Sequence, residues 1–328
     1  MPTAPSNREL FRTDGFPEQD RFDIFRDEII RRNGSLDVAR RGIGTFRAEL
    51  HRQAVGPIVV GSIIASPLDL FRTQNMLADS NDSFVIHMCR SGRPVSTQRD
   101  EAIRLAPGDA VICDWRNTGS FRLDSETHFS SINIPRPVLS KRLRRLPNGG
   151  SLLSGDDTAR RLLFSYIDTA RALPLSDGSR AAELYGEHVL DLAALALGAE
   201  GETREIAEQR GARAARRAAI LRIISQQFGD PGLDPAAVAA QLGITPRYLH
   251  MLLEETGCSF TQHLLDKRLE QAAVLLRDPR QHGWKISAIA QEAGFADLSY
   301  FNRAFRRRFG DTPSGVRAAA GQRLQNER

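Results

Sequence analysis

The sequence of 328 residues has no apolar run close to the ~18 residues that a membrane-spanning helix needs. We therefore expect no transmembrane segment and no membrane partner. It also has only three cysteines, Cys89, Cys113 and Cys258, which lie far apart. This number and spacing fit neither a disulfide framework nor a four-cysteine zinc site. We expect reduced thiols and a cytoplasmic location.

Lysine is nearly absent, because among 45 basic residues only Lys141, Lys267 and Lys285 are not arginine. Residues 201–328 carry 19 of the basic residues against 14 acidic ones, so the net charge of +5 lies in the last third. Arginine binds phosphate, guanine and carboxylate groups through two parallel hydrogen bonds. The surplus therefore favours an anionic partner, although an ordinary solvated surface explains a surplus of this size equally well.

The spacing of apolar residues changes along the chain and divides it into segments. Residues 1–20 show no sustained period and predict a flexible arm. Residues 21–146 contain short apolar runs between turn residues, which is typical of a β-sandwich or a small β-barrel. Residues 156–198 predict two amphipathic helices. Residues 199–212 are polar, charged and flanked by glycine, and predict a linker.

The helix expected over residues 181–197 is apolar nearly all round. Such a helix is normally buried on two sides. One interpretation places Leu192 and Leu195 against the same helix of a second subunit, which predicts a homodimer. The alternative is that both sides of the helix are buried within one chain.

Residues 213–320 are helical almost throughout and contain one pattern twice. In the first copy a short helix ends at Gly243 and Thr245, followed by proline, caps the next helix. In the second copy Gly294 and Asp297 have the same roles. Two short helices joined by a glycine turn form a helix-turn-helix unit, whose second helix enters the major groove of DNA. The sequence thus predicts an all-α domain with two such units, joined by a long helix.

The same segment carries a dense set of short motifs: Glu255-Thr256-Gly257, Arg268-Leu269, Gly294-Phe295-Ala296-Asp297, Ser299-Tyr300-Phe301, Phe309-Gly310 and Thr312-Pro313. They resemble the AraC/XylS family of transcriptional regulators. The turn at Pro107-Gly108-Asp109 and the run Asn133-Ile134-Pro135-Arg136 resemble the cupin-type effector domain of that family. The resemblance implies an α+β multidomain protein. Its N-terminal cupin-like β-barrel with flanking helices, over residues 21–198, would bind an effector and dimerise, and residues 213–320 would bind DNA.

In this family the outer faces of the two recognition helices read the bases. The resemblance places Arg247, His250 and Met251 on that face in the first unit, although many members have arginine at the position of Met251. In the second unit it implies a further set of base-reading residues: Leu298, Ser299, Asn302 and Arg303. Arginine suits guanine and asparagine suits adenine. Solvated helix surface is the alternative for each.

A run of three arginines follows the second recognition helix. Arg306, Arg307 and Arg308 resemble phosphate contacts, but positive charge at a helix C-terminus would also complement the helix dipole.

The effector site is less distinct in the sequence. Alignment of the last strands with the family's effector domains implies that Phe121, Phe129 and Ser131 face the interior. His87 and Trp115 are further candidates because of their shape. Ordinary sandwich core is the alternative for all five. The resemblance to the XylS branch implies a small aromatic or carboxylated effector.

Many cupins are metal enzymes, and their metal site needs a His-x-His pair. His51, His87 and His128 each stand alone, and the sequence shows no phosphate loop and no nucleophile elbow. We therefore expect no metal, no cofactor and no enzyme activity. The predicted function is that of a sequence-specific DNA-binding transcriptional regulator. We expect an activator that works with RNA polymerase and not a repressor. The alternatives are a cupin-type metal enzyme with an accessory helical domain, and an architectural DNA binder without an effector.

Overall fold

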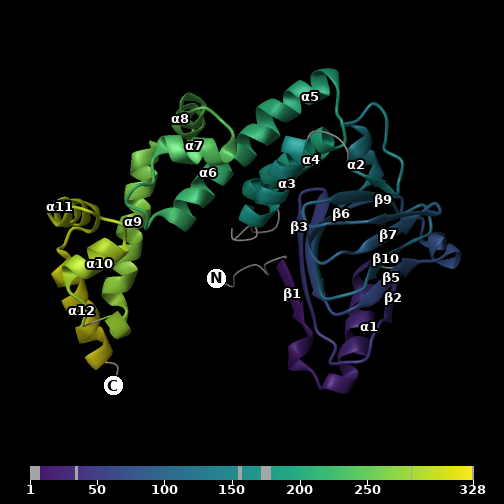
Figure 1. Ribbon diagram of the computed structural model, residues 1–328, viewed down its shortest axis with the longest axis horizontal. Coiled ribbons are helices and arrows are strands. Elements are labelled where there is room, and N and C mark those ends of the chain that lie inside the picture. The colour runs from purple at the N-terminus through teal and green to yellow at the C-terminus, as the bar shows by residue number, and fades with distance from the viewer. Residues whose placement is uncertain (1–7, 34–35, 154–156, 171–178, 282, 327–328) are drawn as a thin grey trace. The chain divides into compact units, whose positions relative to one another are not determined.

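The computed structural model describes residues 8–33, 36–153, 157–170, 179–281 and 283–326 (Figure 1). The chain forms two compact units, residues 1–215 and residues 216–328. The first unit contains the strands together with several helices, and the second consists of helices. The α+β organisation predicted from the sequence is therefore confirmed.

The first unit is built on two antiparallel sheets. The larger sheet has the strand order β1-β3-β4-β11-β6-β9-β12 and the smaller one β2-β5-β10-β7-β8. The strands of the larger sheet are β1 (Arg8–Arg12), β3 (Ala48–Val55), β4 (Ile58–Ala65), β6 (Phe84–Ser91), β9 (Ala110–Asp114), β11 (Thr127–Ile134) and β12 (Ser151–Leu152). Those of the smaller sheet are β2 (Asp37–Arg40), β5 (Leu68–Arg72), β7 (Val95–Gln98), β8 (Glu101–Arg104) and β10 (Gly119–Leu123).

The two sheets face each other across a core that includes Phe46, Phe121 and Phe129. They form a cupin-like pair of sheets, but they do not close into the predicted barrel, since no described strand of one sheet pairs with a strand of the other. Helix α1 (Arg21–Asn33) packs Phe25 and Ile29 into the same core. The segment 21–146 therefore begins with a helix and not with a strand.

The outer face of the larger sheet is covered by α3 (Asp157–Ala170) and α4 (Arg180–Ala196). Both faces of the larger sheet are buried, as strand β11 shows. Its Phe129 points into the core between the sheets, whereas Ile132 and Ile134 pack toward the helices. On α4, Leu192 is fully buried and Leu195 is 5 % exposed within the single chain. The expectation that these two leucines face a second subunit is wrong, because this chain itself covers them.

The predicted arm, residues 1–20, is partly ordered structure, although residues 1–7 lie outside the described residues. Strand β1 pairs with β3 in the register Leu10↔His51. Two short 3-10 turns, Thr13–Gly15 and Glu18–Asp20, follow it. The buried Thr13 hydroxyl accepts a hydrogen bond from the Ala48 amide at 2.8 Å. The sequence around this strand does not predict it, because the strand is held in place by pairing with a segment about 40 residues away.

The predicted linker, residues 199–212, is also structured. It forms α5 (Gly201–Ala207) and a π-turn (Glu208–Ala212) that continues into α6 (Arg213–Gln227). Arg210 donates to the buried carboxylate of Asp191 on α4 at 2.7 and 3.0 Å. A Cβ on Gly211 would lie 2.7 Å from the Cβ of Asp191, so only glycine allows this approach. The segment is therefore packed against α4.

Three short elements complete the first unit: a 3-10 turn (Gln74–Asp79), α2 (Arg136–Ser140) and the junction into α6. The second unit contains most of α6 and then α7 (Pro235–Leu242), α8 (Pro246–Glu254), α9 (Phe260–Arg277), a 3-10 turn (Pro279–Gln281), α10 (Ile286–Glu292), α11 (Leu298–Phe309) and α12 (Pro313–Asn326). Helices α7 and α8 form the first helix-turn-helix unit and α10 and α11 the second, as predicted.

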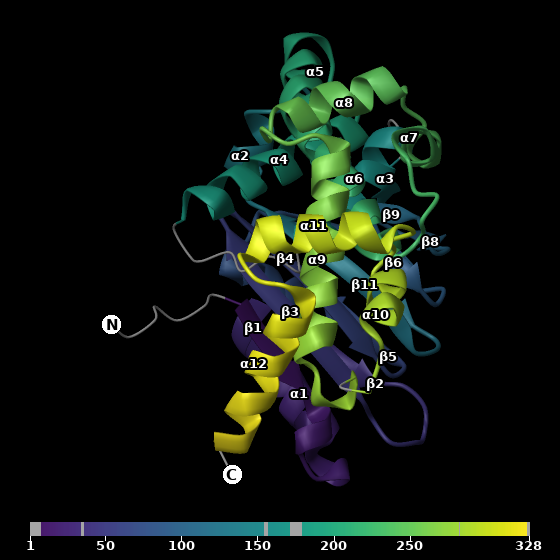
Figure 2. The same ribbon diagram turned by 90° about the vertical axis from the view of Figure 1, so that its left-hand side faces the viewer.

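Local signals set the boundaries of these helices. The side chains of Thr245 and Asp297 accept the amides of Tyr248 and Tyr300, at 3.2 and 2.8 Å, and so cap α8 and α11. Gly294 has φ +87°, and a Cβ there would lie 2.5 Å from the carbonyl oxygen of Phe228. Helix α9 joins two cores of the second unit, because Leu264 packs with the first helix-turn-helix unit and Leu265 packs with the second. In Figure 2, α8 and α11 lie across α9, roughly parallel to each other.

Candidate DNA-binding surface and effector cavity

Helix α8 divides into a buried and an exposed face. Leu249, Leu252 and Leu253 are buried in the core around α7 and α9. Arg247, His250 and Met251 are exposed, as the sequence predicted, and Met251 is 38 % exposed. Positions 247, 250 and 251 lie three and four residues apart, so their side chains share one face of the helix.

Helix α11 is divided in the same way but is longer. Phe301, Ala304 and Phe305 are buried. The predicted base-reading and phosphate-binding residues of this helix are all exposed: Leu298, Ser299, Asn302, Arg303, Arg306, Arg307 and Arg308. Residues near the N-terminus of a recognition helix are the ones that contact base edges. Spacings of three and four residues place Ser299, Asn302, Arg303, Arg306 and Arg307 on one exposed face of α11, whereas Arg308 lies on another side of the helix.

The arginines on these two helices lack acidic partners. Within the described residues, the side chains of Arg247, Arg303 and Arg307 make no hydrogen bond and no ion pair. The pKa of Asp297 is lowered, mainly because its carboxylate accepts hydrogen bonds from the backbone amides of Tyr300 and Ser299. The charge of Arg303 lowers the pKa of Asp297 further, so Arg303 lies near this capping carboxylate, although the two form no ion pair. The guanidinium groups of Arg247, Arg303 and Arg307 can therefore still bind another anion.

Arg308 differs from its two neighbours, because its guanidinium lies 5.5 Å from the centre of the Phe309 ring. It therefore has a packing role that Arg306 and Arg307 do not share within the described residues. This contact favours a structural interpretation for Arg308.

A cavity of about 120 Å³ lies between the two sheets of the first unit. All five residues predicted for the effector site line it, and they come from four separate segments: His87, Trp115, Phe121, Phe129 and Ser131. Alternation along the strands explains this convergence, since residues two apart on β11 face the same side. An engineered cavity of ~150 Å³ in another protein holds benzene. This cavity is therefore of a size for one small ring.

Aromatic rings form one wall of the cavity. The ring of His87 stacks on Phe121 with centroids 4.6 Å apart, and Phe129 lies 5.6 Å from His87 and 4.9 Å from Phe121. Burial lowers the pKa of His87 to about 4, so the imidazole is neutral at neutral pH. Its Nδ1 atom is buried and has no hydrogen-bond partner among the described residues. The wall thus offers an apolar surface with one unused polar atom.

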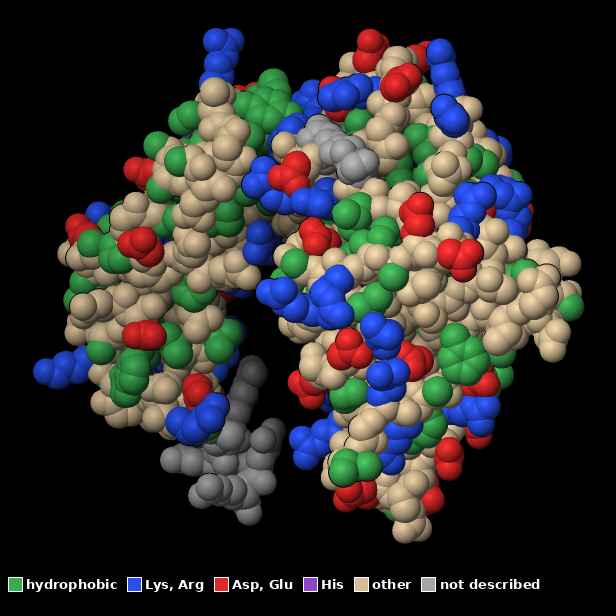
Figure 3. All heavy atoms as spheres, turned by 45° about the vertical axis from the view of Figure 1, so that its right-hand side comes forward, with side chains coloured by type: hydrophobic (Ala, Val, Ile, Leu, Met, Phe, Trp, Pro, Cys, Tyr) green, Lys and Arg blue, Asp and Glu red, His purple; other side chains and the backbone are tan. Residues whose placement is uncertain are grey.

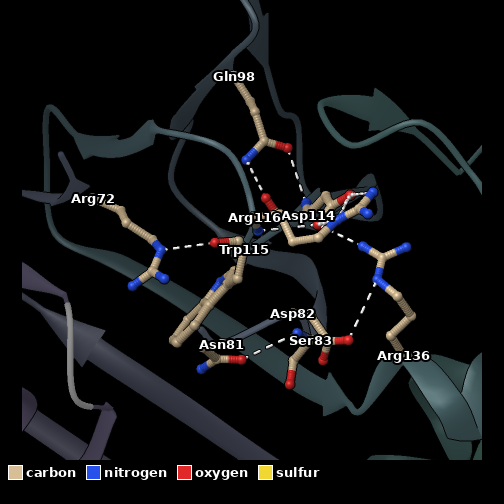
Figure 4. A network of polar contacts seen from close by, with 9 residues as sticks. All are labelled: Arg72, Asn81, Asp82, Ser83, Gln98, Asp114, Trp115, Arg116 and Arg136. Atoms are coloured by element: carbon tan, nitrogen blue, oxygen red, sulfur yellow. Dashed lines mark hydrogen bonds and ion pairs between the residues drawn. The ribbon is translucent and has the colours of Figure 1, made fainter. Parts of the chain in front are cut away.

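A polar network holds the loop that carries Trp115 (Figure 4). The Arg72 Nε atom donates to the Trp115 carbonyl oxygen at 2.8 Å. The side-chain amide of Gln98 donates to the carbonyl oxygen of Asp114 and accepts from its amide, both at 2.9 Å. The Asp114 carboxylate accepts from Arg136 at 2.7 Å. These bonds fix the backbone on both sides of the cavity wall.

Burial alone would raise the pKa of Asp114. Hydrogen bonds from Arg116 and Arg136 outweigh burial, so the pKa lies below its usual value. The network therefore contains a carboxylate that stays charged near neutral pH, held between two guanidinium groups.

Sequence analysis missed several residues of the cavity. Arg52 and Arg72 both line it, together with Gln98. A signal was present, because Leu50 and Arg52, like Leu70 and Arg72, are two apart on a strand and so share a face. A charged residue on the inner face of a strand is unusual and points to a polar requirement there.

In the part of the chain that the structure describes, no helix is long and apolar enough to cross a membrane. No group of three or more His, Cys, Asp or Glu side chains there is arranged so that it could hold a metal ion.

The fold and these two sites define a class of protein: a DNA-binding transcription regulator with a separate effector-binding domain. Comparison with known families agrees. Residues 25–198, more than half of the chain, match the AraC-binding-like domain, and residues 238–319 match a helix-turn-helix domain of this type. The chain belongs to the AraC family of transcriptional regulators.

Several characterised relatives resemble the chain to different extents. The transcriptional activator NphR of Rhodococcus sp is 27 % identical over 274 residues, which are 82 % of this chain and 80 % of NphR. The transcriptional activator RhrA of Rhizobium meliloti is 36 % identical over 105 residues, which are 32 % of this chain and 33 % of RhrA. The crystal structure of the AraC-like transcriptional activator CuxR covers 81 % of this chain and 94 % of its own, with 20 % identity and a TM-score of 0.49.

Proposed function

We propose that this protein is a transcriptional activator that reads DNA with the exposed faces of α8 and α11 and responds to a small molecule bound between its two sheets. The observation that carries the proposal is the set of exposed arginines on α11, which form no ion pair with the described residues. Guanidinium groups in this state supply both phosphate contacts and guanine readout. The relatives named above as activators support the direction of regulation.

Within this proposal, Arg247, His250, Met251, Ser299, Asn302 and Arg303 face the bases, and Arg306 and Arg307 contact phosphates. Helix α9 has 18 residues and is therefore about 27 Å long at ~1.5 Å per residue. A helix of this length, with α8 and α11 lying across it, supports placement of the two helices in successive major grooves of one duplex, about one turn apart.

The two alternative functions, an architectural DNA binder and a metal enzyme, make different demands on the cavity between the sheets. An architectural DNA binder needs no effector, and the cavity lined by aromatic rings favours the regulator instead. A metal enzyme would need a cluster of ligands, and among the described residues no three His, Cys, Asp or Glu side chains are arranged to hold a metal ion. The regulator is thus the function that uses both the exposed helices and the cavity.

A regulator of this kind would act on DNA in the cytoplasm and contact RNA polymerase. We also propose a homodimer, because two copies would place two DNA-binding domains on repeated half-sites. This part of the proposal no longer depends on Leu192 and Leu195, which the chain itself buries. Sedimentation of the full chain tests it: a single species of twice the chain mass supports the dimer, and a monomer at all concentrations contradicts it.

Sequencing of the DNA fragments that the protein retains in cells tests the proposed function. We expect fragments that share one motif next to promoters, and loss of that motif when Asn302 and Arg303 are both changed to alanine. The matched control is Arg47→Ala, which removes an exposed arginine of the other unit. Retained DNA without any shared motif, or the same loss with the control variant, would contradict the proposal.

A further inference from the structure

Arg268 lies on α9 at the point where the two cores of the second unit meet. The leucines near it pack in different directions, because Leu264 belongs to the core of the first helix-turn-helix unit and Leu265 and Leu269 to the core of the second. The side chain of Arg268 is half-buried, and it lies on neither of the exposed faces of α8 and α11. Readout of DNA by these faces therefore does not explain this arginine.

The guanidinium group of Arg268 holds the backbone that follows α6. Its Nε atom donates to the carbonyl oxygen of Phe228 at 2.8 Å, and a terminal nitrogen donates to the carbonyl oxygen of Asp230 at 2.7 Å. Carbonyl groups at the end of a helix lack partners within the helix. Because a guanidinium is planar and rigid, two hydrogen bonds from it fix both the position and the direction of this loop relative to α9.

The same guanidinium group also lies against the turn of the second helix-turn-helix unit. A Cβ on Gly294 would lie 2.8 Å from the Nε atom of Arg268 and 2.5 Å from the carbonyl oxygen of Phe228. Burial lowers the pKa of Arg268, whereas Asp230 and Tyr300 raise it, so Tyr300 of α11 lies near as well. Arg268 thus contacts the loop before α7 and the turn before α11 at one point.

Each side of this junction, formed by Phe228, Asp230, Arg268 and Gly294, is anchored in a different core. Leu233, at the end of the loop, is buried in the core of the first helix-turn-helix unit. The neighbours of Gly294 are buried in the core of the second: Ala293 and Phe295. A shift of one helix-turn-helix unit relative to the other therefore has to break the hydrogen bonds of Arg268.

We propose that Arg268 is a positioning residue that fixes the distance and the angle between α8 and α11, and thereby the number of base pairs between the two groups of bases that the protein reads. This inference rests on the proposed function, because it requires both helices to contact one duplex. Arg268 itself contacts no base. It acts through the loop after α6 and the turn before α11.

The spacing of the two contact patches on DNA tests this role with the full chain. A retained DNA fragment is compared with two derivatives that have one base pair inserted or removed between the patches. Either change moves one patch by about 3.4 Å along the duplex and about 35° around it. We expect the wild type to bind the original fragment at least about tenfold more tightly than either derivative, because one helix loses its base contacts.

Arg268→Gln should reduce this preference to about threefold or less, because the two helix-turn-helix units are then no longer held at one spacing. Arg268→Lys should show an intermediate preference, since an ammonium group donates without the fixed directions of a guanidinium. The matched control is Arg277→Gln, which changes an exposed arginine of the same helix and should keep the full preference. Circular dichroism checks that each variant is folded, and if Arg268→Gln is not, the preference of Arg268→Lys decides the outcome.

An equal loss of affinity for all three fragments, with the tenfold preference kept, would overturn the positioning role and leave Arg268 a stabilising residue only. Specific binding by the wild type that is equal at all three spacings would overturn it too, because no spacing is then fixed. The proposed function fails in a different way, namely if the wild type binds random DNA as tightly as the retained fragment. The two failures are therefore distinguished on the same preparations.

Discussion

In the first unit the least exposed arginines are held by carboxylates, whereas the arginines on α8 and α11 form no ion pair with the described residues. Arg72 is 5 % exposed and pairs with Asp79, and Arg136 is 15 % exposed and pairs with Asp114. On the face seen in Figure 3, basic and acidic side chains are interspersed over the first unit. One residue type thus serves two purposes, and its partner decides which: a paired arginine holds the fold, and an unpaired one is available for a ligand.

Breaking a paired arginine should have the largest effect, and it should fall on stability. Asp114→Asn removes the carboxylate that pairs with both Arg116 and Arg136, and it leaves the half-buried guanidinium of Arg136 with only the longer contact to Asp82, at 3.8 Å. We expect the free energy of unfolding of the first unit to fall by about 3–5 kcal/mol. Urea denaturation followed by tryptophan fluorescence measures this, since Trp115 adjoins the site.

Asp124→Asn is the matched control for this prediction. Asp124 is 42 % exposed and lies 3.3 Å from Arg122 and 3.8 Å from both Arg41 and Arg104. Each exposed pair of this kind is worth at most ~1 kcal/mol. Equal losses from the two substitutions would show that burial does not distinguish the arginine pairs.

The contrast between buried and exposed groups extends to histidine and predicts a pH effect. Burial lowers the pKa of His87 to about 4. Below pH ~6.5 the unfolded chain binds a proton at this residue and the folded chain does not. Stability should therefore fall as the pH drops from ~6.5 to ~4, by about 2–3 kcal/mol from this group.

His87→Leu should flatten this part of the stability profile, and His250→Gln, which changes an exposed histidine of α8, should not. Unfolding free energies at several pH values between 4 and 7 separate the two variants. Parallel profiles for the wild type and His87→Leu would show that His87 is not buried as described.

Arg303 tests the unpaired side of the comparison. Arg303→Ala should cost ~1–3 kcal/mol in binding to the specific site and relax selectivity at one base pair, with stability unchanged. Competition binding against sites with single base changes measures both effects. If specific and random DNA are weakened alike, Arg303 does not read a base.

Arg307 should behave as a phosphate contact. Arg307→Ala should weaken all sequences about equally and reduce the slope of log affinity against log salt by about one ion. Titrations over a range of salt concentrations with specific and random DNA give the two slopes. An unchanged slope would place Arg307 away from the backbone.

We expect the smallest effect on DNA affinity from Met251, which lies on the exposed face of α8, one turn after Arg247. Met251 offers an apolar contact to a thymine methyl group. Replacing thymine by uracil in the first half-site should cost the wild type about 0.8 kcal/mol, the value of one buried methyl-sized group. Met251→Ala should be insensitive to that replacement, and equal sensitivity of both proteins would rule the contact out.

The second unit could be predicted almost element by element, because its signals are local. Thr245, Asp297 and the glycines between the helices act within a few residues, and the structure has the caps and turns where the sequence indicates them. The exposed faces of α8 and α11 follow directly from helical periodicity. That these faces bind DNA remains a proposal.

The first unit was harder to predict because its order comes from distant pairs. The sequence indicates strands, but not that β1 pairs with β3 or that the sheets stay separate. Polar composition predicted a linker where Arg210 reaches back 19 positions to Asp191. Helix α4 is apolar on two sides, so both sides had to be buried. No sequence pattern shows whether residues of the same chain or of a second subunit bury them.

A contact map on one retained DNA fragment, made by ethylation and methylation interference with the full chain, tests whether the arginines of α8 and α11 place both helices on one face of the duplex. We expect two patches of contact whose centres lie about 10 base pairs apart, with Arg303→Ala removing contacts in one patch only. A single patch, or two patches about half a turn apart on opposite faces, would contradict it.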